Sequence, residues 1–500
     1  MQFNSFIFIL LFLPLTALLY FLANRFHKFA GKMVLFIASI IFYAYSDWHT
    51  LIILGISCAV NYLFSILITK TDRFGKATGC EIPPHLKGLR YRMWGGVFLP
   101  VVVNVGLLLY FKYSNFAITN INTYFTTELA LKELMLPLGI SFFTFQQIAY
   151  IVAVYKGEIE KNSLTDYLVF IFYFPKILMG PLTDPIDFIG QLNDESRKRI
   201  NWENIACGIK IFSLGLFKKV MIADVFSKAV SWGYTNYDAA TSADWFLVML
   251  FYTFEIYFDF SGYSDMAVGA SMIFNITLPV NFDSPYKAIS IRDFWKRWHI
   301  SLTRFFTKYI YIPLGGSRKG IFFTCLNTMI VFLVSGIWHG ANWTFILWGL
   351  LHGAFSILDR FTEKYQKNIF EPARWICTFT TVNILWLLFR SDSINQWRDI
   401  LNRMICFQNT TISDGLINSF VLQESSFMND VLRLDWYTEN IRGFWMMLYI
   451  LISYAICLVF ENNYKKLRHI SWFTMVVSAI AFIWGFICLS GESVFVYFNF

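Results

Sequence analysis

Long apolar runs alternate with short polar segments along most of this chain. Many of the runs hold about 18 or more apolar residues, the length that a helix needs to cross a bilayer. The pattern predicts an all-α polytopic membrane protein with about twelve transmembrane helices. We expect these spans near residues 4–23, 33–47, 50–69, 93–113, 134–155, 203–227, 244–270, 320–338, 343–359, 373–390, 443–461 and 471–490.

One further apolar segment, residues 164–185, is interrupted by Pro175, Gly180, Pro181 and Pro185. Breaks of this kind persist at membrane depth only where protein satisfies the backbone groups that they free. The segment is therefore predicted to be a re-entrant element rather than a full crossing.

The placement of Lys and Arg predicts the orientation. Basic residues follow the first span at 25–32 and none precedes it, which favours an outside N-terminus over a cleaved signal peptide. Twelve crossings then put the basic stretches 287–319 and 465–468 inside. The polar loop 391–442 becomes extracytoplasmic, and one membrane domain fills residues 1–500.

Composition supports this class of protein. The chain is 56% hydrophobic and 20% aromatic but only 15% charged, which is too apolar for a soluble core. Because the basic residues cluster in loops between spans, the net charge of +8 reflects topology and gives no reason to expect nucleic acid. The eight cysteines are scattered, so neither a zinc site nor a disulfide framework is indicated, and no bound cofactor is expected.

A basic stretch at residues 290–312 has the periodicity of an amphipathic helix. Ser290 and Asp293 resemble a capping box at its start. The helix is predicted to lie in the membrane plane as an interfacial amphipathic helix, with its basic face toward the cytoplasm. The apolar face holds Ile291, Phe294, Trp295, Trp298, Leu302, Phe305, Phe306 and Tyr309, and the basic face holds Arg292, Lys296, Arg297, Arg304 and Lys308.

Two histidines are candidates for chemistry. His299 sits at the edge of the apolar face, where it is either an interfacial side chain between lipid and water or a functional group. His339 follows one apolar run and precedes another, with Gly336 and Gly340 beside it. There it is either a general base, approached by substrate past the glycines, or a histidine bonded to a neighbouring helix. His352 lacks such flanks and is expected to be structural.

Three carboxylates lie within one predicted span, at Glu255, Asp259 and Asp265. They could orient a catalytic histidine, form a structural network or relay protons in a transporter. We favour the structural network, in which Asp259 and Asp265 contact and orient the catalytic groups rather than the substrate.

Several strings resemble the membrane-bound O-acyltransferase (MBOAT) family. The resemblance is closest to its bacterial branch of alginate O-acetylation proteins (AlgI-like) and peptidoglycan O-acetyltransferases (PatA-like). It covers nearly the whole chain. The strings that carry it are residues 257–265, 278–286, 294–302, 309–316 and 338–341, with further agreement at 136–145, 174–181 and 215–220. One departure is Ala153, where relatives tend to carry Asp, and we interpret it as a local change in packing.

The resemblance implies an acyltransferase whose helices form a funnel through the membrane. His339 would be its catalytic residue, and His299 would lie toward the cytoplasmic side, where the acyl donor enters. Residues beside the two histidines are expected to bind substrate. These are Lys296, Arg297, Trp298, Trp338 and Asn342.

The C-terminal residues 493–500 hold four aromatic side chains among the last six positions and should pack back against the protein. They resemble a tyrosine-containing terminal motif of this branch and of the small partner in D-alanyl transfer. By that analogy Tyr497 accepts the acyl group as a transient ester. The alternative is a hydrophobic plug for the last span.

These features predict acetyl transfer from a cytoplasmic thioester, acetyl-CoA or an acyl carrier protein, in the bacterial inner membrane. The cations of Lys296 and Arg297 suit a phosphate-bearing carrier, and His339 would deprotonate the attacking hydroxyl. The acceptor would be an exported polysaccharide or peptidoglycan, reached through a separate extracytoplasmic partner such as an SGNH-type protein. The sequence does not show the oxyanion donors.

Two other functions stay open at this stage. One is D-alanyl transfer to teichoic acids, whose enzymes are typically shorter and use a separate subunit for the terminal motif. The other is a proton-coupled transporter or flippase that uses the carboxylates between Glu255 and Asp265. A transporter would more often show inverted repeats, and we find none in the sequence.

Overall fold

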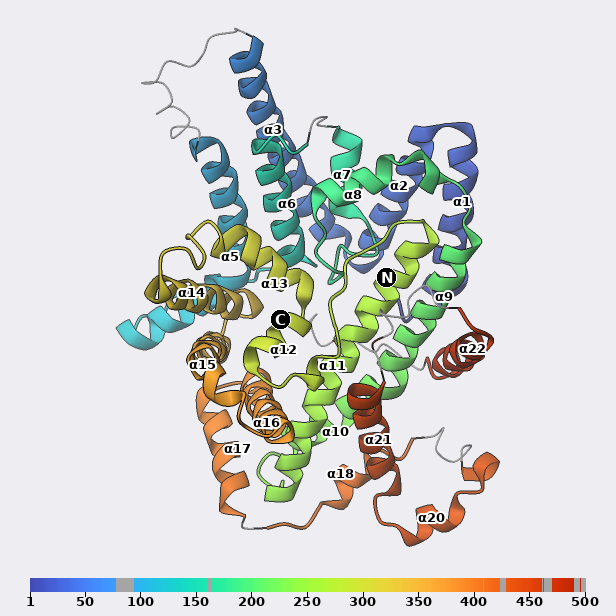
Figure 1. The fold of residues 1–500 in the computed structure, drawn as a ribbon, viewed down its shortest axis with the longest axis vertical. Coiled ribbons are helices and arrows are strands. Elements are labelled where there is room, and N and C mark those ends of the chain that lie inside the picture. Colours follow the sequence, from blue (N-terminus) through green and yellow to red (C-terminus); the bar gives the residue numbers. More distant parts are fainter. Residues whose placement is uncertain are drawn as a thin grey trace. The chain divides into compact units, whose positions relative to one another are not determined.

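The computed structural model describes residues 1–77, 94–159, 163–407, 409–422, 429–460, 462, 470–489 and 495, and every regular element in these ranges is a helix. The chain divides into two compact units, and Figure 1 labels the helices that build them. The first comprises Met1–Ile209 and Ala267–Pro279, and the second comprises Lys210–Met266 and Val280–Phe500. Each unit is described separately below.

The first unit is built from the N-terminal helices. It contains η1 (Phe8–Phe12), α1 (Leu13–Phe26), α2 (Lys28–Ser46), α3 (Trp48–Ala77), α5 (Trp94–Phe125), α6 (Ile140–Tyr155), α7 (Leu164–Phe172), α8 (Pro185–Asn193), η2 (Glu195–Lys198) and the first half of α9 (Trp202–Phe217).

The second unit contains all the candidate residues that the sequence singled out. Its helices are η3 (Lys218–Ala223), α10 (Asp224–Thr235), α11 (Ser242–Ile273, whose last turns belong to the first unit), η4 (Pro285–Lys287), α12 (Ile291–Arg297), α13 (Ile300–Phe306), η5 (Thr307–Tyr311), α14 (Ile321–His339), α15 (Trp343–Gln366), α16 (Glu371–Arg390), α17 (Ile394–Cys406), α18 (Asp414–Asn418), α20 (Asp435–Asn440), α21 (Phe444–Tyr454), η6 (Ala455–Val459) and α22 (Trp472–Ile487).

Each of the twelve predicted spans is helical over most of its described residues. Within the described ranges, five stretches are long and apolar enough to cross a bilayer: Phe8–Phe26, Phe29–Ser46, Trp48–Thr69, Val97–Phe125 and Ile321–His339. Along the first of them Leu10, Leu11 and Leu18 expose 61–64% of their surface, as expected for side chains that face lipid. The protein is thus a helical membrane protein, and the count of twelve crossings stays a prediction.

The predicted span 134–155 is helical only from Ile140. Pro137 lies just before it, and Gly139 adopts a left-handed conformation with φ +71°. The backbone therefore enters the helix through a turn, which a sequence pattern of apolar residues does not reveal.

The segment 164–185 is interrupted where its prolines predicted. α7 ends at Phe172, and α8 begins at Pro185 behind Asp184, whose carboxylate accepts the Ile186 N–H at 3.0 Å. The turn between them is buried and includes Lys176, whose ammonium donates to the Thr183 hydroxyl at 2.7 Å. Whether this element re-enters the membrane stays a prediction.

Candidate active site

The predicted helix 290–312 is in fact two helices with a break at Trp298 and His299. α12 begins as expected, because the Ser290 hydroxyl accepts the Asp293 N–H at 3.2 Å. It ends at Arg297. Trp298 is extended, and His299 has φ 44° and ψ 52°, a left-handed conformation that is rare for a residue other than glycine. The prediction of a single continuous helix was therefore wrong.

The break follows from backbone hydrogen bonds to an earlier segment. The Asp283 N–H donates to the Arg297 carbonyl at 3.0 Å, and the Ile300 N–H donates to the Asn281 carbonyl at 2.9 Å. The Ser301 hydroxyl adds a 2.6 Å bond to the Asn281 side-chain oxygen. These contacts occupy groups that would otherwise continue the helix, and they turn the His299 ring inward. The helical periodicity of residues 290–312 does not reveal these contacts with Asn281 and Asp283.

His299 is buried, with only 1% of its surface exposed, so it does not lie between lipid and water as one sequence interpretation held. Its ring packs edge-on against Phe260 at 4.7 Å and lies 6.4 Å from the ring of Trp338. Among the residues that the structure describes, neither ring nitrogen has a hydrogen-bond partner. Burial lowers the pKa of His299 well below its ordinary value, and the nearby His339 lowers it further. The ring is therefore neutral at physiological pH.

His339 ends α14 and is also buried. Its Nδ1 lies 2.6 Å from the Ser335 carbonyl oxygen. Because a carbonyl oxygen can only accept, the Nδ1 atom must carry the proton, and in the neutral ring Nε2 is then the basic nitrogen. The ring is enclosed by Trp338 at 4.8 Å, Trp348 at 5.0 Å and Phe389 at 5.4 Å between centroids. This arrangement fixes the tautomer that a general base needs.

The glycines beside His339 allow neighbouring groups to pack closely. The expectation that they also admit a substrate stays a prediction. A Cβ atom at Gly336 would fall on the Phe345 carbonyl oxygen, and one at Gly340 would fall on the Phe345 ring. Gly349 of α15 is similarly pressed against the Phe332 carbonyl. Backbones of α14 and α15 therefore approach closely, which holds His339 against α15.

His352 is fully buried on α15 and is bonded to another helix, as expected for a structural histidine. Its Nδ1 accepts the indole N–H of Trp295 at 3.1 Å. The bond joins α12 to α15. It lies close to His339, because the ring of Trp348 contacts both His339, at 5.0 Å, and His352, at 4.8 Å between centroids.

The residues predicted to bind substrate have different surroundings. Trp298 is buried in an aromatic cluster, 4.9 Å from the rings of both Phe282 and Trp386. Trp338 lies between the rings of His299 and His339. A role in binding substrate stays a prediction for both.

Two of the other predicted binding residues have structural partners. Asn342 caps α15, accepting the Thr344 N–H at 3.1 Å and donating to the Asp392 carbonyl at 2.9 Å. Arg297 is paired with Asp293 at 2.9 Å. Their predicted contact with substrate is untested.

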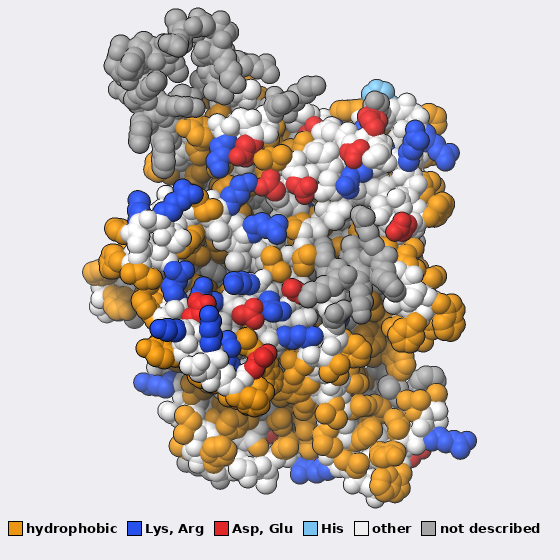
Figure 2. Space-filling view, viewed as in Figure 1, with side chains coloured by type: hydrophobic (Ala, Val, Ile, Leu, Met, Phe, Trp, Pro, Cys, Tyr) orange, Lys and Arg blue, Asp and Glu red, His pale blue; other side chains and the backbone are white. Residues whose placement is uncertain are grey.

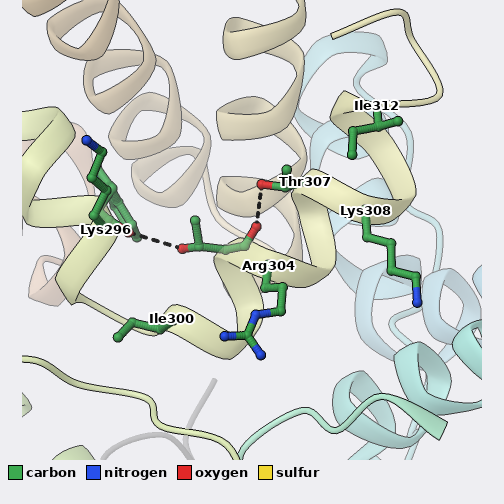
Figure 3. A pocket seen from close by; sticks show the side chains of 8 residues that line it. Lys296, Ile300, Arg304, Thr307, Lys308 and Ile312 are labelled. Atoms are coloured by element: carbon green, nitrogen blue, oxygen red, sulfur yellow. Dashed lines mark hydrogen bonds between the residues drawn. The ribbon is translucent and has the colours of Figure 1, made fainter. Parts of the chain in front are cut away.

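Lys296 lines a surface groove of about 330 Å³ along α12, α13 and η5 (Figure 3). Arg304 and Lys308 add two more cations. In this view their charged ends point downward, whereas the ammonium of Lys296 points upward. Figure 2 shows Lys and Arg side chains gathered over this part of the second unit. The lining residues are Trp295, Lys296, Ile300, Thr303, Arg304, Thr307, Lys308 and Ile312. A groove with apolar walls and three cations suits a ligand that carries both phosphate and hydrocarbon.

Asp259 and Asp265 form buried ion pairs with lysines that the sequence reasoning did not connect to them. The Lys219 ammonium lies 2.6 Å from Asp259 and 2.9 Å from Asp224, and Lys218 lies 2.7 Å from Asp265. Both lysines begin η3, a short π-helix that follows α9. This is the favoured structural network, and its basic half was visible in the sequence only as an isolated Lys-Lys pair.

Phe495 is the described residue nearest the C-terminus, and it is fully buried in the second unit. Its ring packs edge-on against Tyr263 at 5.0 Å and lies 4.4 Å from the Lys219 ammonium. This agrees with the expectation that the aromatic end packs against the protein. Tyr497 lies outside the described residues.

Sequence reasoning missed several residues that shape the site. Phe260, Phe389, Trp348 and Trp386 enclose the histidines, yet in a chain so rich in aromatics their type carried no signal. In the described ranges no group of three or more His, Cys, Asp or Glu side chains could hold a metal ion.

Comparison with known proteins identifies the family. Residues 97–391 match the model of the MBOAT, membrane-bound O-acyltransferase family. The whole chain is 34% identical to the peptidoglycan O-acetyltransferase of Helicobacter pylori and covers 97% of it. Over 83% of its length it is 36% identical to the probable alginate O-acetylase AlgI of Azotobacter vinelandii, covering 80% of that protein.

A more distant relative is the teichoic acid D-alanyltransferase of Streptococcus thermophilus. It is 27% identical over 52% of this chain, which covers 69% of it. All these relatives are named for acyl transfer, so the transporter interpretation is set aside. The chain belongs to the membrane-bound O-acyltransferase family and is an O-acyltransferase.

Proposed function

We propose that this protein transfers an acetyl group from a cytoplasmic thioester to a hydroxyl of an exported polymer, with His339 as general base. The observation that carries the proposal is the 2.6 Å contact between Nδ1 of His339 and the Ser335 carbonyl oxygen, which leaves Nε2 as the basic nitrogen of a ring buried among aromatic side chains.

The chemistry follows from that tautomer. Nε2 of His339 takes the proton of an attacking hydroxyl while the hydroxyl oxygen bonds to the thioester carbonyl carbon. The tetrahedral intermediate collapses with cleavage of the carbon–sulfur bond. The thiolate leaves and receives the proton from the His339 ring, so that an ester and a free thiol are formed and the base is restored.

The donor is acetyl-CoA or an acetylated acyl carrier protein, held at its phosphates by the basic groove. Lys296, Arg304 and Lys308 line that groove, and Trp295 forms part of its wall. Trp295 also donates to His352, whose ring contacts Trp348 beside His339. One side chain therefore lines the groove and is bonded to a residue close to the proposed base.

The acceptor is peptidoglycan in the first instance. The relative named as a peptidoglycan O-acetyltransferase matches the whole chain, whereas the alginate O-acetylase relative matches 83% of it. Tyr497 takes the acetyl group as an ester on the outer side of the inner membrane. An SGNH-type extracytoplasmic partner then moves it to the polymer.

Labelled donor tests the proposal. Purified protein is incubated with acetyl-CoA that carries radioactivity in the acetyl group, and protein-bound label is measured before and after hydroxylamine, which cleaves esters. We expect hydroxylamine-labile label on the wild type and none on His339→Ala or Tyr497→Phe. His49→Asn, a change at an exposed histidine, is the matched control.

The outcomes separate the parts of the proposal. Label and CoA release that persist in His339→Ala would overturn the role of the base. CoA release that requires acceptor, with no label on the wild type, would overturn the tyrosyl ester alone. Transfer from a D-alanyl carrier protein but not from acetyl-CoA would replace acetyl transfer by D-alanylation.

A further inference from the structure

Trp348 has a buried indole N–H without an acceptor. The side chain is fully buried on α15, and within the described part of the chain its Nε1 makes no hydrogen bond. Leaving such a donor unpaired costs about 1–3 kcal/mol, so native proteins keep few of them, and each calls for an explanation. The ring of Trp348 lies 5.0 Å from that of His339.

His352 contributes a second donor of the same kind. Its Nδ1 accepts the Trp295 N–H at 3.1 Å, and a ring nitrogen can accept only when it carries no proton. The proton of His352 is therefore on Nε2. That atom too has no partner among the residues that the structure describes.

The two rings are neighbours, and that of Trp348 lies beside His339. Trp348 and His352 are four residues apart on α15, a spacing that puts side chains on one face of a helix, and their ring centroids are 4.8 Å apart. The surroundings are aromatic and buried: the ring centroids of Phe389 and Trp386 lie 5.2 Å and 5.9 Å from that of Trp348. Unpaired N–H groups among buried apolar rings are strong donors to a charge that forms there.

We propose that the Trp348 indole N–H and the His352 Nε2–H form the oxyanion site of the acyl transfer. Both donate to the thioester carbonyl oxygen as it becomes negatively charged on attack, and both are released when the carbon–sulfur bond breaks. Trp295 is a positioning residue that fixes the His352 tautomer. This inference rests on the proposed function, since it requires a thioester carbonyl beside His339.

Kinetics of Trp348→Phe give the first test. The change keeps an aromatic ring and removes the N–H. We expect kcat for acetyl-CoA to fall by about 10²–10³-fold, with KM changed by less than about threefold, because the bond strengthens only in the transition state. Trp245→Phe is the matched control, since Trp245 is also fully buried with an unpaired Nε1 but packs on Tyr234 and Tyr237 instead. Its kcat should stay near that of the wild type.

Infrared spectroscopy separates donation from packing. Acetyl-CoA with a ¹³C-labelled carbonyl is bound to His339→Ala, which does not turn over. Loss of a hydrogen bond in Trp348→Phe/His339→Ala should move the carbonyl band to higher frequency, and the same shift is expected for His352→Phe/His339→Ala. If Trp348→Phe prevents folding, benzothienylalanine in place of Trp348 keeps the shape of the indole without the N–H.

Three results would overturn the inference. The first is a kcat for Trp348→Phe within threefold of the wild type. The second is an equal loss in Trp245→Phe, which would indicate a packing defect. The third is an unchanged carbonyl band. Acetyl-CoA turnover by the wild type is measured first: its absence would overturn the proposed function together with the oxyanion site, whereas turnover that ignores Trp348 overturns the oxyanion site alone.

Discussion

The ring of Phe495 lies over the ammonium group of Lys219, with Nζ 4.4 Å from the ring centroid. The same ammonium is held by Asp259 at 2.6 Å and Asp224 at 2.9 Å. An aromatic ring near the C-terminus is thus bound to the ion pairs of α11 and η3. The carboxylates that the sequence singled out therefore hold the ammonium that Phe495 contacts, in addition to pairing with lysines of η3.

Removing that ring should loosen the second unit. Phe495→Ala is expected to destabilise the protein by about 3–5 kcal/mol, because a buried phenyl ring leaves a cavity. Phe495→Leu keeps most of the apolar volume and loses the cation–π contact, worth about 0.5–2 kcal/mol. Thermal unfolding in detergent measures both. Phe473→Ala, at a ring that is 70% exposed, is the control, and an equal effect there would contradict the anchoring role.

The buried pair of Lys219 and Asp259 should respond to removal of one partner more than to removal of both. Lys219→Met leaves the Asp259 carboxylate, 1% exposed, without its cation, and we expect a loss of about 3–5 kcal/mol. Asp259→Asn should cost a similar amount. The double variant should lose less than the sum of the two, which denaturation midpoints of all four proteins would show. Additive losses would mean that the two groups do not interact.

Stability should fall in mild acid because of His299. Its pKa is lowered in the folded protein by burial, so the unfolded chain binds a proton first as pH falls through about 6.5. The stabilising effect of the neutral ring is therefore complete above about pH 6.5 and is lost below it, by at most about 1.4 kcal/mol per pH unit.

Melting temperatures between pH 5 and 7.5 test this effect. His299→Asn keeps a residue that tolerates the left-handed backbone and removes the titrating group, so its melting temperature should depend less on pH. His49→Asn serves as the exposed control. Equal pH dependence in the wild type and His299→Asn would refute the prediction.

The glycine contact between α14 and α15 should not admit a methyl group. Gly336→Ala would drive a Cβ atom into the Phe345 carbonyl oxygen, and we expect a loss of about 1–3 kcal/mol or more together with reduced activity. Gly55→Ala on α3 meets nothing within 4 Å and should be neutral or stabilising by up to about 1 kcal/mol. Unfolding and acyl transfer measured on both variants would distinguish the two sites.

The basic groove should affect donor binding rather than the chemical step. Lys296→Met and Arg304→Met are each expected to raise KM for acetyl-CoA by about two- to fivefold with little change in kcat, because surface cations contribute modestly to binding a phosphate. The effect should shrink at high salt. Lys367→Met, an exposed cation at the far end of α15, is the control. A fall in kcat without a change in KM would argue against a donor site.

The positions of apolar runs and prolines in the sequence predicted most of the helices. The twelve apolar runs are helical over most of their described residues, and α7 ends before Pro175 as expected, because apolar runs and proline placement act through local chemistry. The break at His299 could not be predicted in this way. It is imposed by Asn281 and Asp283, which lie a loop away and act through backbone atoms.

The site was predictable in its residue types but not in its pairings. An imidazole at membrane depth marked His339, since such a group is rare without a function. Its tautomer depends on the distance to the Ser335 carbonyl, and the partners of Asp259 and Asp265 come from a different helix. Likewise His352 looked structural, and only its bond from Trp295 reveals which of its nitrogens carries the proton.

The close contact of α14 with α15 also has an evolutionary consequence. His339, the proposed base, and the residues that enclose it on these helices, from Ser335 to His352, lie within 18 consecutive positions, joined by the link at Gly340. Such a hairpin can be inherited as one cassette. Changes in the groove at α12 and α13 can then alter which donor is used while the hairpin itself stays unchanged.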